Sequence, residues 1–499
     1  MSIKSLMMKQ KENEKKQAVL PKIQSANTYS EWLCAQTEWE ALSSIYKWRD
    51  RSATSVEDEH NYPYASVKAH QEQLETALRN KDSASLLSNL TEGLYRLLNE
   101  ISGPELYSIS ALGSKHLTSD YFNTISKCID FLCKDPTLPH AAKINLLKTA
   151  QKNLGAPALM LSGGGTFGIY HLGVIKALHE HQLIPEIICG TSMGSIAAGV
   201  LATHNDDELS ALFLKTHEQD YAPLKKLSLN EVTKQKCLLD SQRLYDCIES
   251  NTGDVTFADA YKHTGRTVSI TVSPARQNQK PRILNHLTSP NALIAYASKA
   301  SCSVPGLFPP VQLQQRIHNK QTPYCTDERW IDGSFATDIP RQRMSRLFNV
   351  NFFIVSQANP HILPFVKSKQ KKGFLPAIQD VVTETFLAQS LAILNVLRRR
   401  NKQAFFRSWI DQCASMIDQD YQGDINIHPT FPLKWFRKIM INPTQDELDY
   451  LILMGERVTW PKIAQINEQT KLHRKLSDSL KLLENKKLSS INKIEMAFI

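Results

Sequence analysis

The 499-residue sequence contains no uncharged run of eighteen or more apolar residues, although apolar residues make up 42% of it. We therefore predict no membrane-spanning helix. Residues 1–16 turn charged at once and lack the apolar segment and small-residue cleavage site of a secretory signal. These absences predict a cytoplasmic protein.

Patterns typical of disulfides, metal sites and nucleic-acid binding are also missing. The nine cysteines show no Cys-x-x-Cys spacing, so we interpret them as reduced thiols, mostly in the core. No helix-turn-helix or zinc-finger spacing is visible, and aromatic residues do not interleave with basic ones. The formal charge of +10 then favours a solvated surface or an anionic membrane surface over a nucleic-acid partner.

The composition divides the chain into four regions. Residues 1–27 are rich in Lys, Gln and Glu and predict disorder or a loose helix. Residues 28–153 carry apolar side chains at three- and four-residue spacing, which predicts a helical domain. Residues 155–362 alternate short apolar runs with helical patterns, and residues 363–499 return to helix.

Four apolar runs that end in Gly or Ser predict the strands of the third region. They are residues 158–162, 186–190, 268–272 and 352–356. Strands that alternate with helices predict an α/β fold with a mainly parallel sheet. In such a sheet, ligands bind beyond the carboxyl ends of the strands.

The second of these strands runs into Gly190-Thr191-Ser192-Met193-Gly194, and a run of small residues follows. A GxSxG motif between a strand and a helix is typical of a nucleophile elbow. Gly190 and Gly194 relieve crowding in the turn, and the helix amides favour negative charge near Ser192. We predict Ser192 as a nucleophile; the alternative is a glycine-rich turn with an idle serine.

The first strand is followed by Ser162-Gly163-Gly164-Gly165-Thr166-Phe167-Gly168. Consecutive glycines let backbone N–H groups point into one cavity, which suits an oxyanion that develops during acyl transfer. The same glycines satisfy the GxGxxG dinucleotide pattern, so a nucleotide-binding protein stays an alternative. A dinucleotide site would need an acidic residue after the next strand, which here ends in Cys189-Gly190.

A serine nucleophile needs a base within hydrogen-bond reach. Asp332 lies in Trp330-Ile331-Asp332-Gly333-Ser334, with Asp338 close behind. A Ser-Asp-His triad with His361 would suit the order along the chain, but His361 follows a proline in a turn-like segment and His171 lies inside a helix. A carboxylate in a dry site can itself serve as base because desolvation raises its pKa. We therefore favour Asp332.

These motifs, in this order, resemble the patatin-like phospholipases. The resemblance implies a three-layer α/β/α sandwich with a mainly parallel sheet, flanked by N- and C-terminal helical regions, and a Ser-Asp dyad without metal or cofactor. Two positions depart from the usual pattern: Phe167 stands where many patatins have Arg or Lys, and Ser334 where Gly or Ala is usual. Carried over by motif, the roles are nucleophile for Ser192, proton acceptor for Asp332, oxyanion hole for Gly163, Gly164 and Gly165, and motif support for Gly168, Gly190, Gly194 and Gly333.

A narrower group within that family, triacylglycerol lipases with an N-terminal helical domain of unknown function, is similar over roughly residues 28–480. This resemblance implies cleavage of fatty-acyl esters of triacylglycerol or glycerophospholipid, taken from a membrane or lipid-droplet surface. Transfer of the acyl group to a lipid alcohol stays open, as does a lipid-surface binding protein with a vestigial site. Candidate linings of an acyl groove are residues 295–296 and 304–310, and a helix at 374–397 is a candidate lipid contact.

Overall fold

The computed structural model of the chain describes residues 3–43, 45–50, 63–101, 104–276, 279–335, 337–359, 421–429, 431 and 433–497. The chain forms two compact units. The first contains Met1–Pro157, Asn349–Asn351 and Trp460–Ile499, and the second contains Ala158–Phe348 and Phe352–Thr459. All the motifs singled out above lie in the second unit. No helix among the described residues has the length and hydropathy needed to cross a bilayer.

The first unit is helical. Its helices are α1 (Ile3–Ser25), α2 (Tyr29–Leu42), α3 (Ile45–Asp50), α5 (Tyr64–Arg79), α6 (Ser83–Ile101), η1 (Pro104–Tyr107), α7 (His116–Lys134), α8 (His140–Leu154) and the later part of α20 (Gln445–Ala497). Buried side chains of α7, such as Ile125, pack with Leu472 and Leu476 of α20. Helix α1 occupies most of the segment for which the sequence predicted disorder or a loose helix.

The second unit is built on a seven-stranded sheet. Its strands are β1 (Ala156–Leu161), β2 (Ile187–Gly190), β3 (Thr267–Pro274), β4 (Arg282–Leu284), β7 (Trp330–Asp332), β8 (Val350–Ser356) and β9 (Ile425–Ile427). Their order is β4-β3-β2-β1-β8-β9, with β7 also on β3. β2 pairs parallel with β1 and β3, and β9 parallel with β8, whereas β4 and β7 run antiparallel to β3. The four predicted strands are β1, β2, β3 and β8, so the mainly parallel sheet is confirmed.

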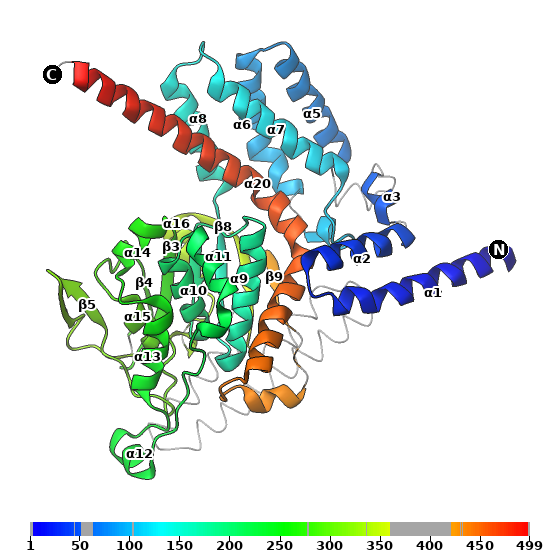
Figure 1. Cartoon of the computed structure of the whole chain (residues 1–499). Coiled ribbons are helices and arrows are strands. Elements are labelled where there is room, and N and C mark those ends of the chain that lie inside the picture. Colours follow the sequence, from blue (N-terminus) through cyan, green and yellow to red (C-terminus); the bar gives the residue numbers. More distant parts are fainter. Residues whose placement is uncertain are drawn as a thin grey trace, which may run out of the picture. The chain divides into compact units, whose positions relative to one another are not determined.

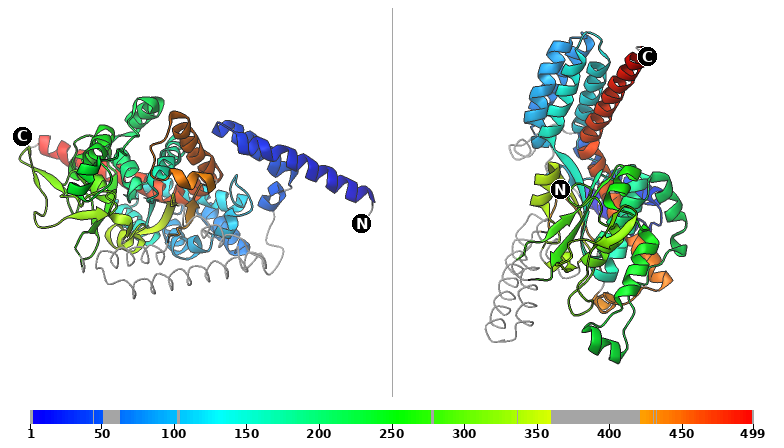
Figure 2. Two further views of the ribbon diagram at one scale, coloured as in Figure 1. Left: turned by 90° about the horizontal axis from the view of Figure 1, so that it is seen from below. Right: turned by 90° about the vertical axis from the view of Figure 1, so that its left-hand side faces the viewer.

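Helices flank this sheet (Figures 1 and 2), as expected because its central strands are buried on both faces. They are η2 (Gly165–Ile169), α9 (Tyr170–Glu180), α10 (Met193–Thr203), α11 (Asp206–Leu214), η3 (Thr216–Glu218), α12 (Leu229–Gln235), α13 (Ser241–Thr252), α14 (Phe257–Thr264), α15 (Ile294–Ser301), η4 (Gly333–Phe335), α16 (Arg341–Phe348) and η6 (Leu433–Lys438). Helix α10 packs on β2 and β3, and α15 packs on β3 and β7. A separate hairpin joins β5 (Gln314–Ile317) and β6 (Lys320–Pro323). The second unit thus has the predicted α/β/α sandwich.

Strand β9 corrects the expectation that residues 363–499 are helical throughout. It extends the sheet beside β8, so sheet residues continue well beyond residue 362. A strand of three residues is too short for hydrophobic periodicity to reveal. The predicted helix at 374–397 lies outside the described residues, and the predicted domain boundaries stay a prediction.

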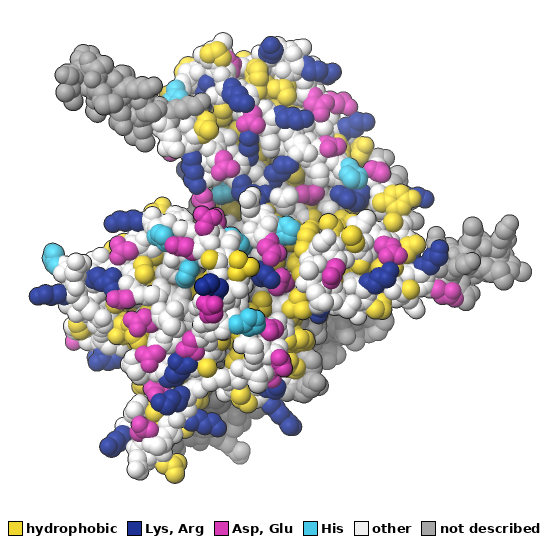
Figure 3. Space-filling model, viewed as in Figure 1, with side chains coloured by type: hydrophobic (Ala, Val, Ile, Leu, Met, Phe, Trp, Pro, Cys, Tyr) yellow, Lys and Arg dark blue, Asp and Glu magenta, His cyan; other side chains and the backbone are white. Residues whose placement is uncertain are grey.

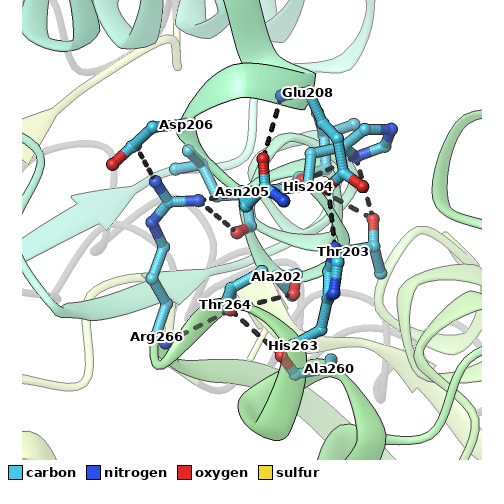
Figure 4. Close-up of polar contacts among 12 residues, drawn as sticks. Ala202, Thr203, His204, Asn205, Asp206, Glu208, Ala260, His263, Thr264 and Arg266 are labelled. Carbon is cyan, nitrogen blue, oxygen red and sulfur yellow. Dashed lines mark hydrogen bonds and ion pairs between the residues drawn. The ribbon is translucent and has the colours of Figure 1, made fainter.

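Arg266 fastens the C-terminal end of α10 (Figure 4). Its guanidinium, only 10% exposed, donates to the carbonyl oxygens of Leu201, at 3.1 Å, and His204, at 2.5 Å, and pairs with Asp206. A positive charge at this end of a helix also complements the helix dipole. Arg266 therefore fixes the helix whose other end carries Ser192.

Replacing Arg266 with Met is expected to lower the free energy of unfolding by about 1–3 kcal/mol, because two helix-end carbonyls lose a charged donor. Urea denaturation followed by circular dichroism measures this change. The exposed Arg276 offers a matched Arg→Met control that should unfold like the wild type. Equal midpoints for the two variants would show that the cap contributes nothing to stability.

Candidate active site

Ser192 sits in a strained turn between β2 and α10. Its φ of 50° and ψ of −128° are costly for a residue with a side chain, and such strain is typical of a nucleophile elbow. The turn is held from both sides: the Ser192 amide donates to the hydroxyl of Ser301 at 2.8 Å, and the Ser192 carbonyl accepts from Ser195. The hydroxyl is therefore fixed beyond the carboxyl end of β2.

Three of the predicted supporting glycines are required by close packing. A Cβ atom on Gly194 would lie 2.2 Å from the carbonyl oxygen of Leu161, and one on Gly190 would lie 2.3 Å from the carbonyl oxygen of Gly194. At Gly333 a Cβ atom would lie 2.4 Å from the carbonyl oxygen of Thr271. These contacts are with backbone atoms, which cannot move aside. The turn at Ser192 and the position of Asp332 therefore both depend on glycine.

Asp332 is within hydrogen-bond distance of the serine. The hydroxyl of Ser192 donates to Oδ2 of Asp332 at 2.7 Å. Oδ1 accepts from the amide of Ser334 at 2.8 Å and from its hydroxyl at 2.6 Å, which orients the carboxylate. Asp332 is 1% exposed, and this burial raises its pKa to about 6. The geometry and the raised pKa both suit a proton acceptor.

The glycine loop lies beside the serine but does not use all three glycines alike. The amide of Gly163 donates to Oδ1 of Asp338 at 2.9 Å, so it is occupied, contrary to the predicted role in an oxyanion hole. Gly164 and Gly165 line the same cavity as Ser192. Gly165 begins η2, and the first amides of a helix have no partner within the helix. Gly164 and Gly165 therefore stay the predicted donors.

Asp338 is a second buried carboxylate that the sequence argument did not assign to the site. It is 1% exposed; its Oδ2 accepts from the side-chain amide of Asn359 at 2.6 Å, and its carbonyl accepts from the hydroxyl of Thr191 at 2.7 Å. Burial raises its pKa to about 7. Asp338 thus ties the glycine loop to the elbow. Its signal in the sequence was a second acidic residue six positions after Asp332 in an apolar setting.

The buried histidine of the site region has a structural role. His171 lies within hydrogen-bond distance of the carbonyl oxygen of Ser162, at 2.9 Å, and of the hydroxyl of Ser356, at 2.8 Å. Burial lowers its pKa to about 4, so the ring is neutral near pH 7. It joins the ends of β1 and β8 instead of acting on Ser192. His361, the other candidate, lies outside the described residues.

A cavity of about 250 Å³ opens over the dyad. Ser192, Asp332 and the glycine loop line one side, and the rest is largely apolar, with Met193, Ile196, Leu224, Leu244, Val304 and Phe308 among the lining residues. Val304 and Phe308 belong to the segment predicted to border a groove, whereas Ala295 is buried in the core beneath. Met193 and Ile196 also line a second, smaller cavity of about 30 Å³. Among the described residues, no group of His, Cys, Asp and Glu side chains could hold a metal ion.

Comparison with known proteins places this site in a family. Residues 159–343 match the model of the patatin-like phospholipases, and residues 8–152 match a domain of unknown function, DUF3336. Triacylglycerol lipase ptl3 of Schizosaccharomyces pombe is 32% identical over 460 residues, which cover 88% of this chain and 92% of that protein. The chain belongs to the patatin-like phospholipase family.

Two further relatives match a similar share of this chain. Triacylglycerol lipase ptl2 of Schizosaccharomyces pombe is 30% identical over 470 residues, 88% of this chain and 72% of that protein. Triacylglycerol lipase 4 of Saccharomyces cerevisiae is 28% identical over 466 residues, 89% of this chain. The chain spans only 50% of the length of this last relative. The resemblance predicted from the motifs, including the N-terminal helical domain, is confirmed.

The structure explains both departures from the usual patatin-like pattern. Phe167 is fully buried and stacks on Phe431 with ring centroids 4.2 Å apart, so this position anchors the glycine loop in an apolar cluster. Ser334 supplies the hydroxyl that binds Oδ1 of Asp332, which Gly or Ala could not supply. The first departure thus anchors the glycine loop, and the second orients the carboxylate of Asp332.

Proposed function

We propose that this chain is a serine lipid acyl hydrolase that cleaves fatty-acyl esters of triacylglycerol or glycerophospholipid. The hydrogen bond from Ser192 to Asp332 inside a largely apolar cavity carries this proposal. The names of its relatives as triacylglycerol lipases support the substrate class. The ester would be taken from the surface of a membrane or lipid droplet.

The reaction begins when Asp332 accepts the proton of Ser192. The alkoxide attacks the ester carbonyl, and negative charge develops on the carbonyl oxygen. The amides of Gly164 and Gly165, with the amide of Met193 directly after the nucleophile, stabilise this oxyanion. Asp332 then gives its proton to the departing alcohol oxygen, and the acyl group stays on Ser192 as an ester.

Water completes the cycle by attacking the acyl-enzyme. Asp332 accepts a proton from the water, and the hydroxide adds to the acyl carbonyl. Collapse of the second tetrahedral intermediate releases the fatty acid and returns the proton to Ser192. A lipid alcohol in place of water would receive the acyl group instead, so acyl transfer is a side reaction of the same chemistry.

The cavity also favours an acyl substrate over the alternatives. Its apolar lining, and the smaller apolar cavity that Met193 and Ile196 also line, suit a fatty-acyl chain more than a nucleotide. A vestigial lipid-binding protein would have no need of a strained serine within 2.7 Å of a buried carboxylate. The intact dyad therefore favours hydrolysis.

Fatty-acid release by the purified chain tests the proposal. Triolein emulsion and phosphatidylcholine vesicles are the two substrates, each assayed with and without EDTA. We expect release from at least one substrate and no effect of the chelator, because the proposed steps use only side chains and amides. Tight nucleotide binding without release of fatty acid from either substrate would contradict it.

We further propose that Asp338 is a positioning residue, because its carboxylate holds the glycine loop through the amide of Gly163. Asp338→Ala is expected to lower kcat by roughly 100-fold with little change in KM, since the loop donors act mainly in the transition state. Asp338→Asn keeps an oxygen for Gly163 but loses the acceptor for Asn359, and it should restore most of the activity. Equal losses in both variants would argue that Asp338 has no such role.

A further inference from the structure

The mouth of the active-site cavity carries a surface that the proposed chemistry does not use. We call it the rim, and it consists of residues 224–240 and 437–443. Both segments reach into the cavity wall, the first through Leu224 and the second through Ile439 and Met440. A partner that covers the rim therefore also faces the entrance to Ser192 and Asp332.

The two segments of the rim are joined to each other. The amide of Leu224 donates to the side-chain oxygen of Asn442 at 2.9 Å, and the side-chain amide of Asn442 donates back to the carbonyl of Leu224 at 2.7 Å. The second segment also contacts the glycine loop, because Thr166 donates to the carbonyl oxygens of Ile439 and Ile441. The rim is thus fixed to the catalytic loop.

The first segment is a narrow projection with α12 at its tip (Figure 1). Its two arms pair through Lys226 and Leu239, and the amide of Leu227 donates to the carbonyl of Leu238 at 3.0 Å. The amide of Leu239 donates to the carbonyl of Leu307 at 2.9 Å, which fastens the base of the projection. Its shape is therefore set by backbone hydrogen bonds at the edge of the cavity.

Large apolar side chains on the rim face solvent. Leu229 is 86% exposed, Leu238 52%, Ile441 55% and Met440 37%. Single exposed leucines are common on protein surfaces, but these four belong to the two segments that frame one entrance. Because their burial would be favourable, the rim is suited to a partner that offers an apolar phase.

The same two segments are rich in basic residues. They contain six, Lys225, Lys226, Lys234, Lys236, Arg437 and Lys438, all exposed, against two acidic residues, Glu231 and Asp240. Figure 3 shows Lys and Arg side chains beside hydrophobic ones on the projection labelled α12 in Figure 1. Lys225 pairs with Asp240 at 3.3 Å and Lys438 pairs with Glu447, while Lys226, Lys234 and Lys236 extend the positive charge along the projection. The partner should therefore carry negative charge around its apolar phase.

We infer that the rim docks the protein on a lipid surface with anionic headgroups. The exposed leucine and isoleucine side chains enter the boundary between headgroups and acyl chains, and the lysines contact the headgroup charges. An ester at that surface then enters the cavity over Leu224 and Met440 without crossing water. This inference rests on the proposed function, because only a lipid substrate requires such an approach.

Vesicle flotation of the full chain tests the inference. The probes are vesicles of phosphatidylcholine alone and of phosphatidylcholine with phosphatidylserine. We expect stronger binding to the second, and binding at least about tenfold weaker for the double variants Leu229→Asp/Leu238→Asp and Lys226→Glu/Lys234→Glu. High salt should weaken the binding of the wild type and have less effect on the lysine variant.

Leu287→Asp is the matched control. Leu287 is 62% exposed and follows β4, which runs antiparallel to β3, so it lies beyond the edge of the sheet opposite Ser192. This variant should bind vesicles like the wild type. Equal binding by the wild type and both rim variants, or equal binding to both kinds of vesicle, would overturn the inference.

A soluble ester separates this inference from the proposed function. p-Nitrophenyl butyrate needs no surface, so the rim variants should hydrolyse it at the wild-type rate while losing activity on vesicles. Failure of the wild type to hydrolyse any ester would contradict the proposed function, whether or not it binds vesicles. Full vesicle activity in the rim variants would contradict the docking surface alone.

Discussion

Ser192→Ala is expected to reduce fatty-acid release from triolein and phosphatidylcholine by at least about 10⁴-fold. The variant removes the oxygen that carries the acyl group in the proposed mechanism, while the cavity and the loop amides stay in place. Its fold should be intact, because the Ser192 hydroxyl donates to Asp332 and the turn is held through the amide and carbonyl of Ser192, which bond the hydroxyls of Ser301 and Ser195.

The measurement is fatty-acid release by purified protein, with Ser250→Ala as the matched control. Ser250 is exposed on α13 and its hydroxyl donates to the carbonyl of Cys247 within the same helix, so this variant should keep full activity. Undiminished release by Ser192→Ala would mean that another residue is the nucleophile.

Asp332→Asn is expected to lower kcat by about 10⁴-fold, because an amide cannot accept the serine proton. The substitution keeps the size of the side chain, and the amide oxygen can still accept from Ser334. The folded protein should be at least as stable as the wild type at pH 8. The raised pKa of Asp332 means that its charge opposes folding above about pH 6, and the variant carries no charge there.

The pH dependence of the wild type gives a second test of the same residue. Asp332 must be ionised to act as base, and burial raises its pKa to about 6. We therefore expect kcat/KM to fall about tenfold per unit as the pH drops below about 6. Asp207 is exposed in the first turn of α11, so Asp207→Asn is the matched control for activity and for the pH profile. A fall in kcat/KM that begins only near pH 4 would contradict a buried base.

The dyad and the four main strands were predictable because each left a local pattern. GxSxG between a strand and a run of small residues requires a turn that projects Ser192 beyond the strand, and Asp332 ends a short apolar strand. These patterns depend on neighbours in the chain. The sequence therefore identified the two residues that the structure joins at 2.7 Å.

The contacts that hold the site together were not predictable in the same way. Asp338 meets Gly163 across 175 positions of sequence, and no local spacing indicates that it occupies that amide. The same holds for Asn359 and for the pair formed by Leu224 and Asn442. Such contacts depend on how distant loops pack, which hydrophobic periodicity does not encode.

The most direct test of the central claim is to trap the acyl-enzyme. The wild type is mixed with excess p-nitrophenyl oleate, quenched with acid and digested, and the modified peptide is identified by mass spectrometry. We expect an oleoyl ester on Ser192, a matching burst of p-nitrophenol, and neither signal in Ser192→Ala. An oleoyl ester on another residue, or steady hydrolysis by Ser192→Ala, would contradict this claim.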